Sequence, residues 1–410
     1  MDKAAKFMKR HGMAAETIDV GEYGRIFCEK AELGLAGRQE TLPMIPTYLS
    51  CEASIPQRTP AAVIDAGGTN FRTALVSFCD GKERVEELEK HDMPGAKAPV
   101  SWERFIDATA ERVAPLMDRT DRIGFCFSYP IEVTPERDAI VTSLTKQVRI
   151  DGACGKRLGR DLAAALEKRG LAGKRIVVLN DTPATLLGGI ALRGRSRLGG
   201  VIGLVAGTGM NTCCELPAER IKKLVGASGR MLVNLESGSF DCFARGDFDL
   251  EMDAQLPDTG RYVAEKMVSG RYLGPLCLAT LRGAARERLL SIPAAKALAA
   301  VSELETARAG AWCAGEMPEC FKPEDRAVVQ HITRELFDRA ARCTAAQLDG
   351  IMRLTGDSGA CISVDGSLYK RSELFSGLMR QRLAEAGRSF EIVTGEEMSL
   401  LGAAAAALMN

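Results

Sequence analysis

Two glycine-containing loops are the first places in this chain where the residue types could do chemistry. Each lies between two apolar runs, at residues 67–70 in the first case and 207–209 in the second. Glycine adopts positive φ at little cost, so successive amide N–H groups can turn toward an anion, and threonine hydroxyls add donors. Each loop therefore predicts a phosphate contact, although such a loop on its own is more often an ordinary tight turn.

Two aspartates end apolar runs near these loops. Asp65 follows residues 61–64, and Asp181 follows residues 176–179. A carboxylate at the end of a strand loses hydration unless a cation or donor faces it, and ligands of open α/β sheets bind at that end. Together with the loops, the pair points to a Mg²⁺-nucleotide site. The alternative is that each aspartate is a helix N-cap, above all Asp181, because Pro183 follows it.

The elements around these residues alternate between strand and helix. A hairpin pattern at residues 61–78 returns about 140 residues later at 201–216, which resembles an internal duplication. Alternating strands and helices predict an α/β architecture with helices on the sheet faces, here in two facing units. We expect further strands at 123–127, 176–179 and 361–364, and helices at 158–169, across most of 262–352, and at 400–408 as a buried Ala-rich helix. In the helical first 50 residues, Phe7, Met8, Ile26, Phe27 and Leu33 are expected to point inward.

Composition excludes several classes of protein. The 410 residues contain 54 Lys and Arg against 54 Asp and Glu, so no basic excess predicts a nucleic-acid partner or a membrane anchor. Thirteen cysteines without a CxxC pair favour a reducing cytoplasm. The charged N-terminus and the lack of a long apolar run predict neither secretion nor membrane insertion. With only three histidines, a general base is expected to be a carboxylate.

Familiar nucleotide motifs do not fit this chain, because it has no GxxxxGK[ST] sequence, an incomplete dinucleotide fingerprint and no protein-kinase signatures. Instead, a series of segments resembles the hexokinase family in that family's order, and the resemblance runs from about residue 40 to 375. The segments are VIDAGGTNFR (63–72), GFCFSYP (124–130), TK (145–146), LNDTPATL (179–186), GTGMN (207–211) and VDGSLYK (364–370).

The resemblance implies the actin-like ATPase fold, in which two ribonuclease-H-like domains close on a central cleft. The implied small domain covers residues 58–180 and 395–410, and the implied large domain covers 1–57 and 181–394. The implied sugar contacts are Ser128, Thr145, Lys146, Asn180, Asp181, Asn211, Glu236 and Glu265. The implied contacts to ATP are Asp65, Gly67, Gly68, Thr69, Asn70, Arg72, Gly207, Thr208, Gly366 and Ser367.

The resemblance also implies an activity, the ATP-dependent phosphorylation of a hexose at its 6-hydroxyl, with glucose as the expected substrate. Asp181 would be the catalytic base, assisted by Lys146 and Arg72, and Asp65 and Asp181 would hold Mg²⁺ directly or through water. Two alternatives stay open: a regulatory protein that binds sugar without turnover, and an ATPase of the wider fold. Glu236 and Glu265, taken singly, would more often be solvated surface acids. The expected ligands are a hexose and a nucleotide, and the oligomeric state is left open.

This chain departs from the family pattern at Gln147, Ser237 and Tyr262, which lie around the sugar contacts. It also has Glu396 to Leu401 where the family has a Gly-Ser-Gly-Lys segment near the nucleotide. The implied sugar pocket and the C-terminal nucleotide contact are the parts that these departures affect.

Overall fold

The computed structural model describes residues 2–38, 41–68, 70–144, 148–194 and 198–409. One half of the molecule is built on a five-stranded sheet with the order β10 (Arg175–Leu179), β6 (Arg122–Phe127), β2 (Ala61–Gly67), β3 (Asn70–Cys79) and β4 (Lys82–Asp92). Strands β2, β6 and β10 are parallel, while β2, β3 and β4 form an antiparallel meander. Both faces of β2 are buried, which explains its continuous apolar run.

The second sheet repeats this plan. Its order is β1 (Ile45–Pro46), β13 (Arg230–Asn234), β12 (Met210–Pro217), β11 (Gly199–Ala206), β14 (Gly359–Asp365) and β15 (Ser389–Val393). Apart from β1, the strands β15-β14-β11-β12-β13 correspond one by one to β10-β6-β2-β3-β4, with the same parallel and antiparallel pairs. The predicted α/β class and the duplicated hairpin are therefore confirmed.

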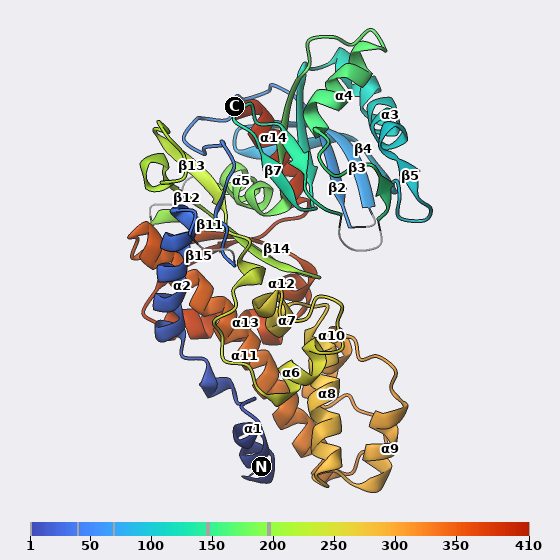
Figure 1. Ribbon diagram of the computed structural model, residues 1–410, viewed down its shortest axis with the longest axis vertical. Helices are drawn as coiled ribbons and strands as arrows, with labels where there is room; N and C mark the ends of the chain where they lie inside the picture. The colour runs from blue at the N-terminus through green and yellow to red at the C-terminus, as the bar shows by residue number, and fades with distance from the viewer. Residues whose placement is uncertain (1, 39–40, 69, 145–147, 195–197, 410) are drawn as a thin grey trace.

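Two helices lie between the sheets: α5 (Asp181–Arg193), which follows β10, and α14 (Met398–Met409), which follows β15 (Figure 1). They pack against each other without room for side chains at the crossing. A Cβ on Gly402 would lie 1.7 Å from the carbonyl oxygen of Ala184, and one on Gly188 would lie 2.3 Å from that of Met398. The predicted close packing of a buried Ala-rich C-terminal helix is confirmed, and α14 ties the two halves together.

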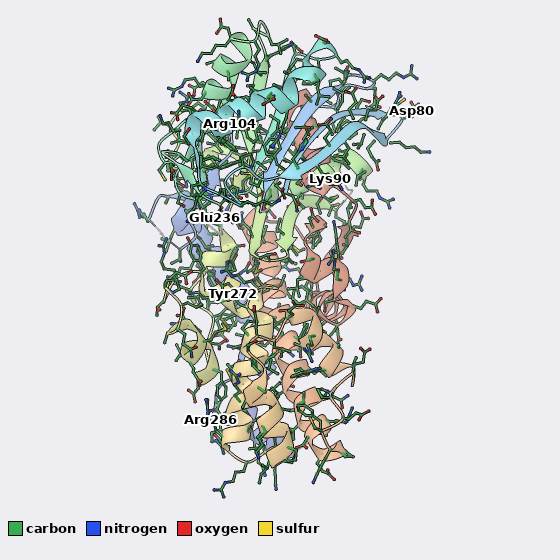
Figure 2. All side chains as sticks on the ribbon, turned by 90° about the vertical axis from the view of Figure 1, so that its right-hand side faces the viewer. Asp80, Lys90, Arg104, Glu236, Tyr272 and Arg286 are labelled. Carbon is green, nitrogen blue, oxygen red and sulfur yellow. The ribbon has the colours of Figure 1, made fainter. Side chains whose placement is uncertain are left out.

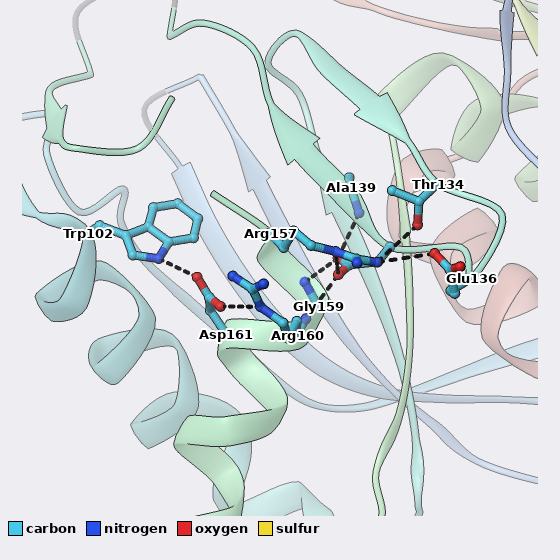
Figure 3. Close-up of polar contacts among 9 residues, drawn as sticks. Trp102, Thr134, Glu136, Ala139, Arg157, Gly159, Arg160 and Asp161 are labelled. Atoms are coloured by element: carbon cyan, nitrogen blue, oxygen red, sulfur yellow. Dashed lines mark hydrogen bonds and ion pairs between the residues drawn. The ribbon is translucent and has the colours of Figure 1, made fainter. Parts of the chain in front are cut away.

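The outer face of the first sheet carries α3 (Trp102–Val113) and α4 (Leu158–Glu167). The residue before α4, Arg157, provides no side-chain cap. Instead the buried carboxylate of Asp138 accepts hydrogen bonds from the backbone N–H of Gly159 at 2.5 Å and of Arg160 at 3.2 Å. Figure 3 shows this network together with the indole of Trp102, which donates to Asp161 at 2.9 Å and joins α3 to α4.

Helices also extend the second half into a long arm, at the bottom of Figure 1. The expected inward side chains of the first 50 residues are largely buried, but Leu33 is 41% exposed, so that prediction is wrong: the residue lies on the solvent side of its helix. Among the described residues, no helix is both long and apolar enough to cross a membrane. The helices of this half are α1 (Asp2–Arg10), α2 (Val20–Leu35), α6 (Asp247–Asp253), α7 (Val263–Val268), α8 (Leu273–Arg286), α9 (Ile292–Ala300), α10 (Thr306–Cys313), α11 (Pro323–Thr355), α12 (Ser367–Arg371) and α13 (Glu373–Glu385).

The remaining elements are short. Strands β5 (Val100–Ser101) and β9 (Ile150–Asp151) form one pair, and β7 (Ile131–Val133) and β8 (Ala139–Val141) form another. Single turns of 3-10 helix occur at Ala15–Thr17, Ala114–Asp118, Ala218–Arg220 and Ser237–Ser239.

Candidate active site

The first glycine loop closes the hairpin between β2 and β3, where Gly67 pairs with Asn70 and Gly68 has a φ of +51°. Ser128 lies beside it at the end of β6, and a Cβ on Gly67 would come within 3.0 Å of the Ser128 hydroxyl. Asn70 is exposed to solvent. The loop therefore presents backbone at the carboxyl end of the parallel strands, which is where a phosphate was predicted to bind.

Asp65 is buried at the end of β2, directly opposite Arg72 on β3, and the two side chains form an ion pair. Two residues near the C-terminus also contact this ion pair. The hydroxyl of Ser399 donates to the Asp65 carboxylate at 3.0 Å, and Glu397 forms a second ion pair with Arg72. Ser399 and Glu397 were not predicted as site residues, although both lie in the segment 396–401 that departs from the family pattern.

Asp181 is the first residue of α5 and is partly exposed. The N-cap is Asn180, whose side-chain oxygen accepts from the Thr182 N–H at 3.3 Å and whose amide donates to the Phe127 carbonyl at 3.4 Å. The alternative that Asp181 caps the helix is therefore wrong by one residue. Since Asn180 satisfies the helix end, the Asp181 carboxylate does not have to do so, and its Oδ1 accepts from the Thr182 hydroxyl at 3.2 Å.

Asp65 and Asp181 lie on either side of Cys126. The register pairs Cys126 of β6 with Asp65 on one neighbouring strand and with Leu179 on the other. Neighbouring strands are about 4.8 Å apart, so the backbones of Asp65 and Leu179 are separated by about 10 Å. Burial raises the pKa of the Cys126 thiol well above its ordinary value, and the negative charges of Asp65 and Asp181 raise it further. Both carboxylates thus lie near one buried sulfur atom.

A cluster of amides and carboxylates forms the opposite side of the site. Asn211 of β12 donates to the side-chain oxygen of Asn234 at 2.9 Å and to the Glu236 carboxylate at 3.4 Å. Asn234, at the end of β13, also donates to Glu236 at 2.7 Å. Asn234 was not among the predicted site residues. It is 5% exposed and joins two predicted contacts, a role that only the pairing of β12 with β13 reveals.

Glu236 follows β13 with a left-handed φ of +55°. Burial raises the pKa of its carboxyl to about 7; the hydrogen bonds from Asn234 and Asn211 oppose this rise, and the charges of Asp181 and Glu265 add to it. Asp181 of α5 and Glu265 of α7 therefore lie near enough to Glu236, which follows β13 by two residues, for their charges to act on it. The alternative interpretation, that Glu236 is a solvated surface acid, is therefore wrong. Figure 2 shows it between the two halves of the molecule.

Glu265 is held against the second glycine loop. Its carboxylate accepts from the backbone N–H of Met210 at 3.0 Å, and a Cβ on Gly209 would lie 2.7 Å from the same oxygen. The next residue, Lys266, is buried and pairs with Asp253 at 2.6 Å. Because this ion pair anchors α7, the placement of Glu265 follows from the packing of its helix as well as from its own hydrogen bond. Glu265 is therefore not a solvated surface acid either.

The second glycine loop meets the turn between β14 and α12. The parallel register pairs Val205 with Asp365, so Gly207 and Gly366 lie side by side. A Cβ on Gly366 would lie 2.4 Å from the Ala206 carbonyl, and its φ is +108°, so glycine is required there on both grounds. Thr208 and Ser367 are exposed beside this contact. The four predicted nucleotide residues 207, 208, 366 and 367 are thus brought together.

Comparison with known proteins agrees with this arrangement. Two family models, both described as hexokinase, match residues 5–190 and 201–409. This chain belongs to the hexokinase family. Human Hexokinase-1 is 30% identical over 369 residues, which cover 82% of this chain and 40% of that protein. Hexokinase-5 of Oryza sativa subsp. japonica is 26% identical over 421 residues, covering 92% of this chain and 82% of the relative. The chain thus spans less than half the length of the human hexokinase.

Solved structures extend the likeness to three dimensions. The hexokinase from Schistosoma mansoni complexed with glucose has a TM-score of 0.78 and 26% identity, covering 99% of both chains. A ROK family glucokinase from Streptomyces griseus matches in fold alone, with a TM-score of 0.52 and 21% identity over 85% of this chain and 99% of that one. The expected two-domain, actin-like ATPase fold is confirmed, while the residue boundaries of the two domains stay a prediction.

Some residues of the hexokinase pattern lie outside the described part of the chain, namely Thr69, Thr145, Lys146 and Gln147. The other two departures from the family pattern, Ser237 and Tyr262, lie in the described part of the chain. Ser237 is buried beside Glu236, and its backbone N–H donates to the Asn211 side chain at 3.2 Å. Tyr262 precedes α7 with a left-handed φ of +53° and stacks with the guanidinium of Arg261 at 5.2 Å. Ser237 thus borders the amide and carboxylate cluster, and Tyr262 lies three residues before Glu265 at the start of the same helix.

The donor set around Asp65 and Asp181 fits magnesium carried in by a nucleotide. In residues 2–409, apart from the short gaps, no group of three His, Cys, Asp or Glu side chains could hold a metal alone. Mg²⁺ usually keeps several waters and binds through one or two carboxylates plus substrate phosphates. Asp65 and Asp181 provide that number of carboxylates.

Proposed function

We propose that this chain transfers the γ-phosphoryl group of ATP to the 6-hydroxyl of a hexose, with glucose as the expected substrate. The observation that carries the proposal is the convergence of Glu236, Glu265 and Asp181 with the amides of Asn211 and Asn234. A sugar presents several hydroxyls that each donate and accept, so its pocket needs charged acceptors and amide donors close together. Family membership supports the same reaction.

The proposed chemistry is an in-line displacement. The sugar oxygen forms a bond to the γ-phosphorus, the bond from that phosphorus to the bridging oxygen of ADP breaks, and ADP leaves with the electron pair. Asp181 accepts the hydroxyl proton. Its place at the open start of α5 supports this role, because the carboxylate is partly exposed while the helix end is already capped by Asn180.

Charge neutralisation and positioning supply most of the acceleration in phosphoryl transfer. The two glycine loops would hold the phosphates, with Gly366 and Ser367 at the nucleoside. Asp65 and Asp181 would hold Mg²⁺, which neutralises phosphate charge when bound, and Arg72 and Lys146 would add positive charge. The ion pairs that Arg72 forms with Asp65 and Glu397 fix its guanidinium beside Asp65, which supports this role.

We further propose that the halves of the chain act as the small domain (58–180 and 395–410) and the large domain (1–57 and 181–394), that sugar draws them together, and that the protein works in the cytoplasm. The packing of the two central helices supports the domain proposal, because α5 contacts β11 and β14 of the second sheet, whereas α14 contacts β2 and β6 of the first.

The deciding experiment measures ADP release from ATP with glucose, mannose, fructose, glucosamine or no sugar. Strong dependence on sugar supports the kinase. Sugar binding by calorimetry without ADP release supports a regulatory sugar-binding protein, and ADP release independent of sugar supports an ATPase. Either of the last two results would overturn the proposal.

A further inference from the structure

A cavity of about 290 Å³ lies on the first half of the molecule, between helix α3 and the segment that follows β4. We call it the basic cavity. It is not part of the site described above, although it lies near it: Asp92, at its edge, pairs across the β3–β4 hairpin with Asn70 of the first glycine loop. Its lining consists of Asp92, Met93, Pro94, Gly95, Lys97, Ala98, Val100, Arg104, Ala108 and Arg112.

The charged residues of the lining are unbalanced. Lys97, Arg104 and Arg112 are cations and Asp92 is the one acid in that lining, which leaves a net charge of +2 from three positive and one negative. Lys97 pairs with Asp92, and Arg104 makes a 3.3 Å contact with Asp107 outside the cavity. In Figure 2 Arg104 lies on the upper half of the molecule, away from Glu236 at the junction of the halves.

Arg112 is the unusual member. Its guanidinium lies 4.9 Å from the centre of the Phe71 ring, and its Nη1 is buried without a hydrogen-bond partner among the described residues. A buried donor left without an acceptor destabilises the folded chain, and more so when it is charged. Burial lowers the pKa of Arg112, and the charge of Glu111 opposes this fall. The positive charge of Arg104 lowers the pKa further, while the charges of Asp92 and Glu89 raise it.

We propose that the basic cavity binds the phosphate group of a small ligand through Arg112, Arg104 and Lys97. A phosphate dianion offers oxygens in several directions, matches the planar fork of arginine, and neutralises the excess of two charges. The volume is several times that of a water molecule, about 30 Å³, and leaves room for a small ester as well as for free phosphate.

The walls of the basic cavity connect it to the proposed active site. The Gly95 carbonyl accepts from the Arg149 N–H at 2.9 Å, and the Val100 N–H donates to the Arg149 carbonyl at 3.1 Å. Gly95 has a φ of +90°, and a Cβ there would lie 2.6 Å from the same carbonyl. The segment is thus fixed to the chain just after the Thr-Lys pair on one side and to the first glycine loop on the other.

The test is calorimetric titration of the full chain with inorganic phosphate and, separately, with glycerol 3-phosphate. The wild-type chain should bind the probe. Arg104→Ala and Arg112→Gln should each weaken that binding at least tenfold. The control Arg84→Ala, at the exposed far end of β4, should leave it unchanged. Phosphate held by the glycine loops would respond to none of these changes. If Arg112→Gln does not fold, Arg104→Ala and Lys97→Ala decide.

Saturable binding by either probe that is lost in these variants supports the proposal, and the tighter probe identifies free phosphate or an ester as the source. No saturable binding below about 10 mM would overturn it, as would binding that is unchanged in Arg104→Ala. The titration does not depend on turnover, so its failure leaves the proposed kinase activity untouched.

Discussion

Between pH 8 and pH 6 the affinity of the chain for glucose should fall about tenfold, because in the proposed site the ionised form of Glu236 accepts hydrogen bonds from the sugar. With a pKa of about 7 for that carboxyl, about nine-tenths of the molecules carry the charge at pH 8 and about one-tenth at pH 6. The apparent dissociation constant rises by the inverse of the competent fraction.

The assay is calorimetric glucose binding at pH 6, 7 and 8 without nucleotide, in buffers of different ionisation enthalpy so that proton release is counted. Below pH 7, binding should release close to one proton. Glu236→Gln should abolish both the slope and the proton release. Asp181→Asn should move the midpoint to lower pH, because it removes a negative charge that raises the pKa of Glu236. A constant wild-type affinity, or a slope that survives in Glu236→Gln, would refute the reasoning.

The raised pKa of Glu236 also makes the free energy of unfolding depend on pH, and this free energy should decrease as the pH rises. The folded chain without sugar holds the Glu236 proton more tightly than the unfolded chain, whose pKa is near 4.5. The contribution of this group to stability is therefore fully present below about pH 4.5 and is lost as the pH rises through about 7. Added glucose should partly offset that loss at pH 8, which thermal denaturation with and without sugar can measure.

Three further outcomes are expected. Asp181→Asn should lower kcat by about 10² to 10⁴ while glucose still binds, and near wild-type turnover would remove Asp181 from the role of base. Asn234→Ala removes the 2.7 Å donor to Glu236 and should raise the KM for glucose about tenfold or more with a smaller change in kcat; an unchanged KM would show that this amide does not position Glu236. Gly402→Ala forces a carbon toward the Ala184 carbonyl and should lower the free energy of unfolding by about 1–3 kcal/mol, whereas Gly377→Ala, with nothing within 4 Å, should not; equal melting temperatures for the two variants would contradict the packing argument.

The elements that the sequence predicted were those with continuous apolar runs. Strands β2, β6 and β11 are buried on both faces, so their composition alone identifies them. Strand β4 was not predicted, because its residues Lys82–Asp92 are almost all exposed or partly exposed and charged. An edge strand of this kind has no apolar run to recognise, and only its pairing with β3 makes it a strand.

The site was predictable to the extent that its residues fall at the ends of such strands. Asp65, Asp181 and Gly207 could be found in that way. Asn234 and Ser399 could not, because each acts through a partner that the sequence does not place nearby: Ser399 and the Asp65 to which it donates are separated by 334 positions. Single residues joined over such distances carry no local pattern, and only the fold brings them together.

The duplication explains why both helices between the sheets begin with residues of the proposed site. Helix α5 follows the outermost parallel strand of the first sheet, and α14 follows its counterpart in the second. The start of α5 presents Asp181, and the start of α14 presents Ser399 to Asp65 of the other sheet. Because these helices touch backbone to backbone, the sugar-driven movement that we propose for the halves would pivot about their crossing. Small-angle scattering should show a more compact particle with glucose, and Gly402→Ala should reduce that change.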